Sequence, residues 1–551
     1  MQHLNRKLPL VDPSNFAMVP RSDVPRSTFK TEHGYKTTFD TGFLYPIEVS
    51  EVLPGDVHKG QVTVFARVSN LLFPLMDNLQ LETFFFFVPC RLIWSNWKKF
   101  MGEQANPADS IAYTIPQLVS PQNGFVVGGL GDHFGLPTVG QVATAQNISV
   151  SALPFRAYNL IYNEWFRDQN LQNSVPQLNG DGPDLIASYN LERRGKKHDY
   201  FTSCLPWPQK GATQISLPIG GIATVRTNAT NVVTGAQTPL KFLRESGASP
   251  QNFLQPLSVL DATGDLSAFS DIAIAQPLGG FKFYPSNLYA DLSTATGATI
   301  NAQRLAVATQ QFLEKDARGG TRYTELLKNH FGVTPEDARL QRPEYIGGGR
   351  SSIHTNAIPQ TSATGLTGGT TPVGSLTAQA LVADRHNFSY HATEHGYIIG
   401  LVHVGADLTY QQGLHKMWSR LTRFDFYWPT FANLGEQAVL NKEIYATGNA
   451  PQDDAVFGYQ ERWAEYRYRP SRITGMFRST SALNIDQWHL AQRFTTLPTL
   501  NATFIRDTPP MARVLAAGTN ADKMQILFDS VFNISCTRPV PTYSVPGLSR
   551  F

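Results

Sequence analysis

Four consecutive phenylalanines restrict the fold of this chain more than any other feature of its sequence. They lie within Leu81–Val88, and Pro89 ends the run. Alternate side chains of a strand point to opposite faces, so this run would place large rings on both sides of a sheet. Such a strand must be covered on both faces, because neither set of rings is stable in water. The sequence therefore predicts a strand in the middle of a layered β core.

Other segments extend this β core. Apolar and polar residues alternate over Gln61–Ser69, the pattern of a strand with one buried face. Tyr397–Val404 is β-branched and partly alternating, and it predicts a further strand. Charged residues make up only 16% of the 551 residues, against roughly 25% in typical soluble domains. With 43 glycines and 36 prolines to form turns, this composition favours long ordered loops and argues against a coiled coil or a helical bundle.

Helices are expected within the loops that separate the strands. Leu153–Gln172 has a proline in its first turn and an aromatic stripe at helical spacing. The stripe consists of Phe155, Tyr158, Tyr162, Trp165 and Phe166. Ala302–Arg318 and Thr321–Phe331 each end at glycine, a common helix stop, and a further helix start is expected at Thr334. The β core is therefore predicted to carry helical insertions.

Composition divides the chain into segments. Residues 211–280 contain no Trp, Tyr or His, although the chain has 20 Tyr and 8 Trp, which indicates an insertion outside the core. Gly, Ser and Thr dominate residues 350–377, which favours a surface loop. The expected segments are an extended amino-terminal arm (1–40), the first part of the core with a helical loop (41–204), a surface protrusion (205–285), a helical region (286–349), a surface loop (350–380), and the rest of the core with the tail (381–551).

No catalytic, cofactor or metal site is predicted. Cys90, Cys204 and Cys536 lie far apart without CxxC spacing, so they are expected to be buried thiols. His391–His395 matches the HxxEH pattern of inverted zinc peptidases, which requires a helix, but strand-like residues follow at once. In a strand the two histidines would be roughly 13 Å apart, too far for one zinc ion. Neither a membrane span nor a signal peptide is predicted, because the required apolar runs are missing.

One segment carries a signal for nucleic-acid binding. Arginines and aromatic residues are interleaved at Arg462, Trp463, Arg467, Tyr468, Arg469 and Arg472. This combination suits a flexible single strand, because guanidinium groups bind phosphates and rings stack on bases. The alternative is a strand whose arginine-bearing face packs against neighbouring elements or subunits. A second basic run, Arg193–His198, is expected to be a solvated loop.

Several motifs, in order along the chain, resemble those of one family. They are Lys36–Gly42, Glu51–Asp56, Phe85–Pro89, Ala157–Asp168, Asp316–Tyr323, Arg339–Tyr345 and Phe457–Arg462. The resemblance is to the major capsid proteins of microviruses, the small icosahedral phages with single-stranded DNA, and more narrowly to the gokushovirus branch. The matches thin out over residues 205–285 and 350–380, where composition also indicates insertions.

The resemblance implies an all-β core, an eight-stranded antiparallel jelly roll of the viral capsid type with long insertions. It implies a T=1 shell of sixty copies that encloses single-stranded DNA, in a virion assembled in a bacterial cytoplasm. The implied partners are a small basic DNA-binding peptide, an internal scaffolding protein, a minor or pilot capsid protein, and a host receptor contacted by the outer loops. The chain is expected to be a structural protein and not an enzyme.

A second hypothesis is a β-sandwich carbohydrate-binding protein or a glycosidase. A glycosidase needs two carboxylates facing each other across a cleft. The sequence alone locates no such pair. A monomeric protein with hydrolase activity would favour this hypothesis over the capsid subunit.

Overall fold

The computed structural model describes residues 25–211, 300–320, 322–333, 341–362, 373–516 and 524–543, together with short strands between residues 224 and 291. The chain divides into two compact units, Met1–Pro208 with Asp316–Phe551, and Gln209–Lys315. The expected helix start at Thr334 and most of the expected protrusion at 205–285 lie outside the described residues.

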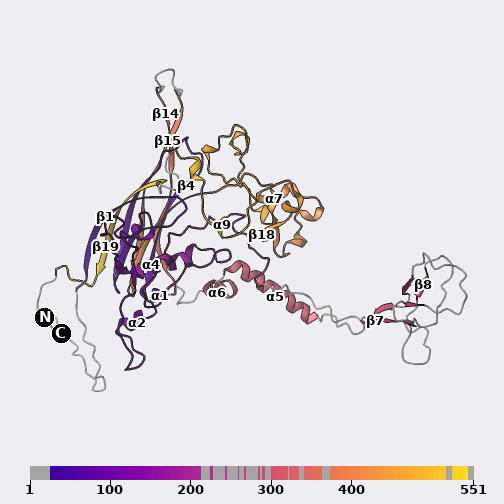
Figure 1. The fold of residues 1–551 in the computed structure, drawn as a ribbon, viewed down its shortest axis with the longest axis horizontal. Coiled ribbons are helices and arrows are strands. Elements are labelled where there is room, and N and C mark those ends of the chain that lie inside the picture. The colour runs from indigo at the N-terminus through magenta and orange to yellow at the C-terminus, as the bar shows by residue number, and fades with distance from the viewer. Residues whose placement is uncertain are drawn as a thin grey trace, which may run out of the picture. The chain divides into compact units, whose positions relative to one another are not determined.

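Eight antiparallel strands form the core of the larger unit (Figure 1). In the order of their hydrogen bonding they are β1 (Ser27–Phe39), β19 (Ile526–Arg538), β3 (Val57–Val68), β15 (Leu376–His391), β13 (Glu344–Ser352), β4 (Leu79–Pro89), β16 (Gly396–Ala406) and β2 (Tyr45–Val52). Counted along the chain, these are the first, eighth, third, sixth, fifth, fourth, seventh and second strands of the core. This is the order of a jelly roll, in which two four-stranded sheets share two Greek keys. The predicted fold class is confirmed.

The two sheets meet at a corner between β13 and β15. These strands pair only at Gly347–Phe388 and Gly348–Asn387. Gly348 has φ of 150°, and a Cβ atom there would lie 2.1 Å from the carbonyl oxygen of Thr83 on β4. Glycine is therefore required at this corner, because any side chain would push the neighbouring strand away.

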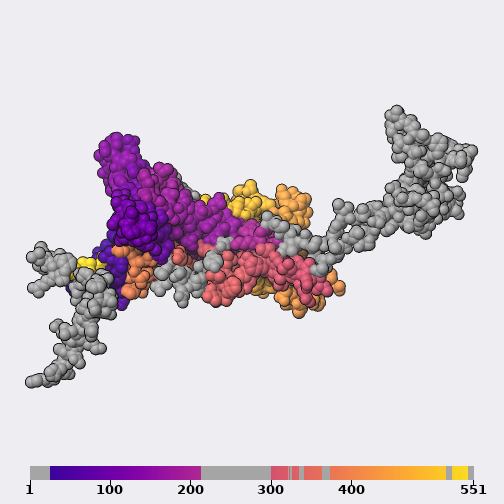
Figure 2. Space-filling view, turned by 90° about the horizontal axis from the view of Figure 1, so that it is seen from below, coloured from indigo at the N-terminus to yellow at the C-terminus, as the bar shows by residue number. Residues whose placement is uncertain are grey.

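The phenylalanine run lies in β4, between β13 and β16, and both of its faces are buried as predicted. Phe85 and Phe87 point between the two sheets, where Phe85 stacks on Phe388 with ring centroids 4.3 Å apart. Phe86 and Val88 point the other way, into a second apolar cluster formed with the insertion that follows β4. In the space-filling view the purple surface of this insertion lies beside the indigo surface of the early strands (Figure 2).

The first predicted helix is shorter than expected. α4 covers Leu153–Ile161, and a single π-helical turn, Tyr162–Phe166, follows it. Arg167 is extended, and the carboxylate of Asp168 accepts hydrogen bonds from the next turn's backbone, which ends the helix. Most of the aromatic stripe is buried, but Trp165 is 38% exposed, and its indole N–H donates to the carbonyl oxygen of Pro343 over 2.9 Å.

The other two helices agree with the sequence. α5 covers Ile300–Gly319, and α6 covers Tyr323–Phe331 and ends at Gly332 with a φ of 71°. In the described residues of the smaller unit, three strand pairs of two to four residues are seen: β7 (Thr224–Thr227) with β12 (Leu288–Asp291), β8 (Phe242–Arg244) with β11 (Phe283–Pro285), and β9 (Ser258–Val259) with β10 (Leu266–Ser267).

The expected amino-terminal arm is wrong from residue 27 onward. Residues Ser27–Phe39 form β1, an edge strand that pairs along its whole length with β19. Most of its side chains are exposed or half-buried, so the apolar alternation that reveals a strand is missing. Backbone hydrogen bonds to β19 hold it in the sheet.

The expected surface loop at 350–380 is also wrong for its described part. β14 (His354–Pro359) pairs with the first residues of β15, and the two form a hairpin that extends beyond the rest of the sheet (Figure 1). β14 is almost entirely exposed, which explains its polar composition. Threonine and serine on a solvated hairpin resemble a loop in sequence.

Candidate nucleic-acid interface

The predicted arginine-rich segment follows a small two-stranded sheet made of β17 (Gln437–Leu440) and β18 (Val456–Gln460). The chain turns at Trp463, whose φ of 67° is unusual for a residue with a side chain, into one 3-10 turn at Ala464–Tyr466. Residues 467–474 then run without regular structure. The segment is a loop, so the predicted alternative of an arginine-bearing strand is wrong.

The two aromatic residues of the prediction have packing roles. Trp463 is 8% exposed, and its indole N–H donates to the carbonyl oxygen of Phe431 over 3.0 Å. Tyr468 is half-buried and stacks on Tyr200, with ring centroids 4.9 Å apart and planes 7° apart. Burial raises the pKa of the Tyr468 phenol. Trp463 is packed inside the protein, whereas Tyr468 is held by Tyr200 and also lines the cavity described below.

The arginines differ in how they are held. Arg467 is exposed and pairs with Glu461. Arg462 is half-buried, and its guanidinium lies 4.9 Å from the ring centroid of Trp463. Arg469 and Arg472 are exposed, and within the described residues they have no ion pair. These two are the members of the segment that are available for a phosphate.

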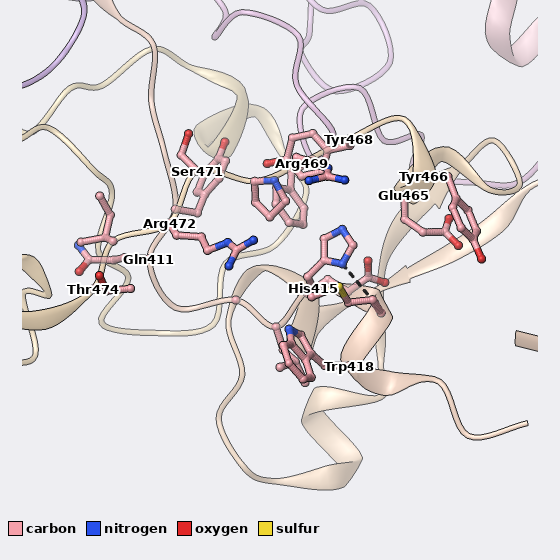
Figure 3. Close-up of a pocket in the computed structure, with 18 of the residues that line it drawn as sticks. Gln411, His415, Trp418, Glu465, Tyr466, Tyr468, Arg469, Ser471, Arg472 and Thr474 are labelled. Atoms are coloured by element: carbon pink, nitrogen blue, oxygen red, sulfur yellow. Dashed lines mark hydrogen bonds between the residues drawn. The ribbon is translucent and has the colours of Figure 1, made fainter. Parts of the chain in front are cut away.

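Arg469 and Arg472 line a cavity of about 660 Å³. Figure 3 shows His415 and Trp418, from a separate loop, around the same hollow. Trp418 is 70% exposed, so its ring is accessible in this chain. The acid Glu465 also lines the cavity, but its carboxylate is buried and pairs with Arg420 over 3.2 Å. The accessible charge at the cavity is therefore positive.

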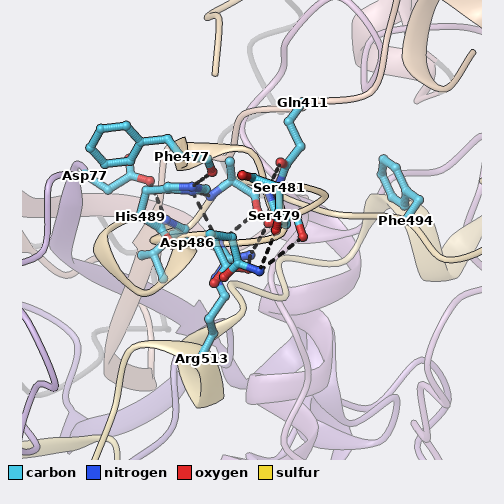
Figure 4. Close-up of polar contacts among 12 residues, drawn as sticks. Asp77, Gln411, Phe477, Ser479, Ser481, Asp486, His489, Phe494 and Arg513 are labelled. Carbon is cyan, nitrogen blue, oxygen red and sulfur yellow. Dashed lines mark hydrogen bonds and ion pairs between the residues drawn. The ribbon is translucent and has the colours of Figure 1, made fainter. Parts of the chain in front are cut away.

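A buried polar network fixes one wall of this cavity (Figure 4). Gln411 donates to the hydroxyl of Ser479 over 2.9 Å and accepts from its backbone N–H over 2.9 Å. Arg513 donates to the carbonyl oxygen of His489 over 2.6 Å. Because Arg478 precedes Ser479 and lines the cavity, the network holds a further arginine at its edge. Polar groups satisfied in this way rigidify the loops that carry them.

The loop that carries Trp418 was missed by the sequence reasoning. Between residues 414 and 434 it exposes large apolar side chains: Leu414, Met417, Trp418, Leu421, Phe424, Phe426, Tyr427, Trp428 and Leu434. We call this set the apolar ridge. Lys416, Arg420 and Arg423 are interleaved with it, which is the same pattern of arginines and rings that identified Arg462–Arg472. The alternation of basic and aromatic residues in the sequence could therefore have indicated this loop as well.

The basic run Arg193–His198 is not a solvated loop, and that expectation is wrong. Lys196 is only 9% exposed, its ammonium lies 4.1 Å from the ring centroid of Phe504, and burial lowers its pKa to about 8. Lys197 pairs with Asp407 over 2.6 Å. The charged groups of Lys196 and Lys197 therefore interact with other parts of the same chain and stabilise the packing of this segment.

The HxxEH match forms no helix. His391 ends β15, and the next residues turn into β16, so the segment is a hairpin turn and only its first residue is extended. Glu394 pairs with Arg91 over 2.8 Å. The glutamate thus has a structural partner, and the arrangement lacks the helical face that a zinc peptidase requires.

Comparison with known proteins decides the family. The sequence profile of the family described as capsid protein (F protein) matches residues 17–548. This chain belongs to the F capsid protein family. Among curated relatives, this chain is similar to the capsid protein VP1 of Bdellovibrio phage phiMH2K, with 46% identity over 536 residues and 97% of each chain covered. It is 41% identical over 612 aligned residues to VP1 of Chlamydia phage 1, covering 99% of each chain.

A third relative, VP1 of Spiroplasma virus 4, is 39% identical over 552 residues, covering 97% of this chain and 98% of its own. The resemblance to microvirus capsid proteins is confirmed. This F capsid protein is a structural subunit that assembles with its own copies into the shell of a virion, and it is not an enzyme. The comparisons do not support the glycosidase hypothesis. Within the described residues, no helix has the length and apolarity that crossing a membrane requires.

Proposed function

We propose that this F capsid protein forms a T=1 shell of sixty copies around single-stranded DNA, and that the cavity beside Arg469 and Arg472 is one of its DNA contacts. The observation that carries this contact is the pair of exposed, unpaired arginines beside the exposed ring of Trp418. Arginines bind phosphates, and an accessible ring can stack on a base. The exposed but paired Arg467 and the packed Trp463 contribute less in this proposal.

The shell does not neutralise its genome by itself. Each chain has a formal net charge of +3, so sixty copies supply on the order of 180 positive charges, against about one negative charge per nucleotide. A genome of a few thousand nucleotides exceeds this by an order of magnitude. A small basic peptide and counterions therefore neutralise most of the DNA. By family resemblance, an internal scaffolding protein and a minor or pilot protein take part in assembly in the host cytoplasm.

Replacing Arg469 and Arg472 together by glutamine is expected to weaken binding of single-stranded oligonucleotides and to flatten its salt dependence. Each phosphate contact on a single strand contributes about 0.7 to the slope of log affinity against log salt, so the double variant should lose about 1.4. Fluorescence anisotropy with a labelled oligonucleotide, titrated at several salt concentrations, measures both quantities.

Arg467→Gln is the matched control, because Arg467 is exposed in the same loop but is paired with Glu461. It should change the slope little. An unchanged slope in the double variant would contradict the proposed contact, and an equal loss in Arg467→Gln would show a diffuse charge effect.

The segment 205–285 is proposed to serve host attachment from the outer surface. Its composition departs from the rest of the chain, and its match to the family motifs is weak. Surface loops with few core residues tolerate such variation and commonly carry recognition. The host receptor is an exposed component of the bacterial surface.

Replacing residues 228–287 by an Asn-Gly turn is expected to abolish adsorption and leave shell assembly intact. Thr227 and Leu288 are directly opposite in the antiparallel pair of β7 and β12, so a two-residue turn can join them. Electron microscopy scores assembly, and particle binding to host cells scores adsorption. Full adsorption by the shortened particles would assign attachment to another surface.

A further inference from the structure

A cluster of three potential metal ligands lies at one end of the first sheet. Asp56 is in the turn between β2 and β3, His58 is the second residue of β3, and Cys536 is directly opposite His58 on β19. Their exposed fractions are 0%, 3% and 7%. Asp56 and Cys536 are 480 positions apart in sequence, so the spacing of the cysteines could not indicate this cluster.

The distances within the cluster fit tetrahedral coordination. The Nε2 atom of His58 lies 3.4 Å from Oδ2 of Asp56 and 3.6 Å from Sγ of Cys536. All three ligand atoms lie within 4.8 Å of one another. Zinc bonds of about 2.3 Å to sulfur and about 2.0–2.1 Å to nitrogen and oxygen place tetrahedral ligand atoms about 3.3–3.6 Å apart. The three ligand atoms could close around an ion once the guanidinium of Arg538, which lies 2.7 Å from Oδ2 of Asp56, moves away.

In the described part of the chain, only one of the two carboxylate oxygens of Asp56 accepts hydrogen bonds. Oδ2 accepts from the backbone N–H of Leu53 over 3.0 Å and from the guanidinium of Arg538 over 2.7 Å. Oδ1 is buried, and among the residues that the structure describes it has no hydrogen-bond partner. A buried carboxylate oxygen without a partner is costly, and a structural ion pair with Arg538 does not by itself explain it. A cation bound by both carboxylate oxygens of Asp56 would satisfy Oδ1, while Oδ2 is the oxygen that lies 3.4 Å from Nε2 of His58.

Binding of a divalent ion changes the protonation of the cysteine. The ion would displace the thiol proton of Cys536 to solvent and stabilise the thiolate.

We propose that Asp56, His58 and Cys536 bind one Zn²⁺ ion, with the fourth position taken by water. Asp, His and Cys are all zinc ligands, and the borderline-soft ion suits a mixed oxygen, nitrogen and sulfur set. The ion links the β2–β3 turn to the end of β19. The guanidinium of Arg538 hydrogen-bonds Asp56 and interacts with Cys536, so an ion has to displace it, and its side chain is 28% exposed and can turn toward solvent.

Titration of the purified subunit with Co²⁺ tests the site, because cobalt replaces zinc and reports thiolate ligation through a charge-transfer absorption band. The band is expected to appear at one equivalent and to disappear when Zn²⁺ is added. It should be lost in Cys536→Ser and in His58→Gln. Cys204→Ser is the control, since this buried cysteine lies outside the cluster, and it should keep the band.

Loss of the band in a variant could also result from misfolding, so a variant that is expected to bind Co²⁺ more tightly is a useful complement. Arg538→Met removes the opposing charge and should tighten Co²⁺ binding severalfold, whereas a purely structural ion pair would gain nothing from this change. The absence of the band in the folded wild-type subunit would overturn the proposal, and so would a band that persists in Cys536→Ser. The test is independent of DNA binding and of attachment.

Discussion

Leu421→Asp is expected to abolish shell assembly and to leave the subunit folded. Leu421 is 93% exposed at the centre of the apolar ridge, where Trp418 and Trp428 are 70% and 50% exposed. A loop that exposes so many large apolar side chains is typical of a protein interface, and the chain's established partner is its own copy. A carboxylate placed there would be desolvated without a partner when two copies meet.

Sedimentation velocity and electron microscopy of particles from expressing cells measure assembly, and thermal melting of the subunit measures folding. Because Leu421 makes little contact within its own chain, the free energy of unfolding should change by less than about 0.5 kcal/mol. Leu421→Met is the matched control and should assemble, since it keeps an apolar side chain of similar size. Normal shells from Leu421→Asp would place the ridge outside the subunit contacts.

Phe86→Ala is expected to reduce the free energy of unfolding by about 3–5 kcal/mol, the range for emptying a buried aromatic site. Phe86 is 1% exposed, and its side chain points from β4 toward the π-helical turn. Its ring centroid lies 5.4 Å from that of Trp165 and 5.9 Å from that of Phe166. Neighbouring strands on both sides of β4 prevent the backbone from collapsing into the cavity. Assembly would then fail through misfolding.

Trp165→Ala tests the same cluster from its exposed edge. Because Trp165 is 38% exposed, its loss should cost less than the loss of Phe86. Urea denaturation of the soluble subunits compares the two free energies. Equal costs would show that the ring of Trp165 matters more than its exposure indicates. A folded Trp165→Ala subunit that does not assemble would identify this residue as an interface contact.

The sequence predicted those strands whose own residues show burial as an apolar run or an apolar–polar alternation. The phenylalanine run and the alternation of Val62, Val64, Ala66 and Val68 each reflect burial of the residue itself, and every one of these valine and alanine side chains is buried in β3. β1 and β14 lack this signal because their side chains are exposed and their stability comes from backbone pairing with distant strands.

The candidate site was only partly visible in the sequence. Arginines and rings at 462–472 indicated a cationic, aromatic surface, and Arg469 and Arg472 do line a cavity. The sequence could not distinguish a ring packed inside, such as Trp463, from one exposed to solvent, such as Trp418. Nor could it show that Lys196 and Lys197 are held by Phe504 and Asp407, because these partners lie hundreds of residues away.

The pairing of β1 with β19 has a consequence for the timing of folding. Ser27 is opposite Arg538, so β1 cannot form its backbone hydrogen bonds until β19 has been synthesised. At about 5–20 residues per second, the intervening synthesis takes roughly 25–100 s. During this time β3 also lacks its neighbour β19, and the edges of both strands are open to pairing with other nascent chains. The first sheet can close only after Arg538 has been synthesised, so we expect the unfinished chain to aggregate unless these edges are protected in the cell.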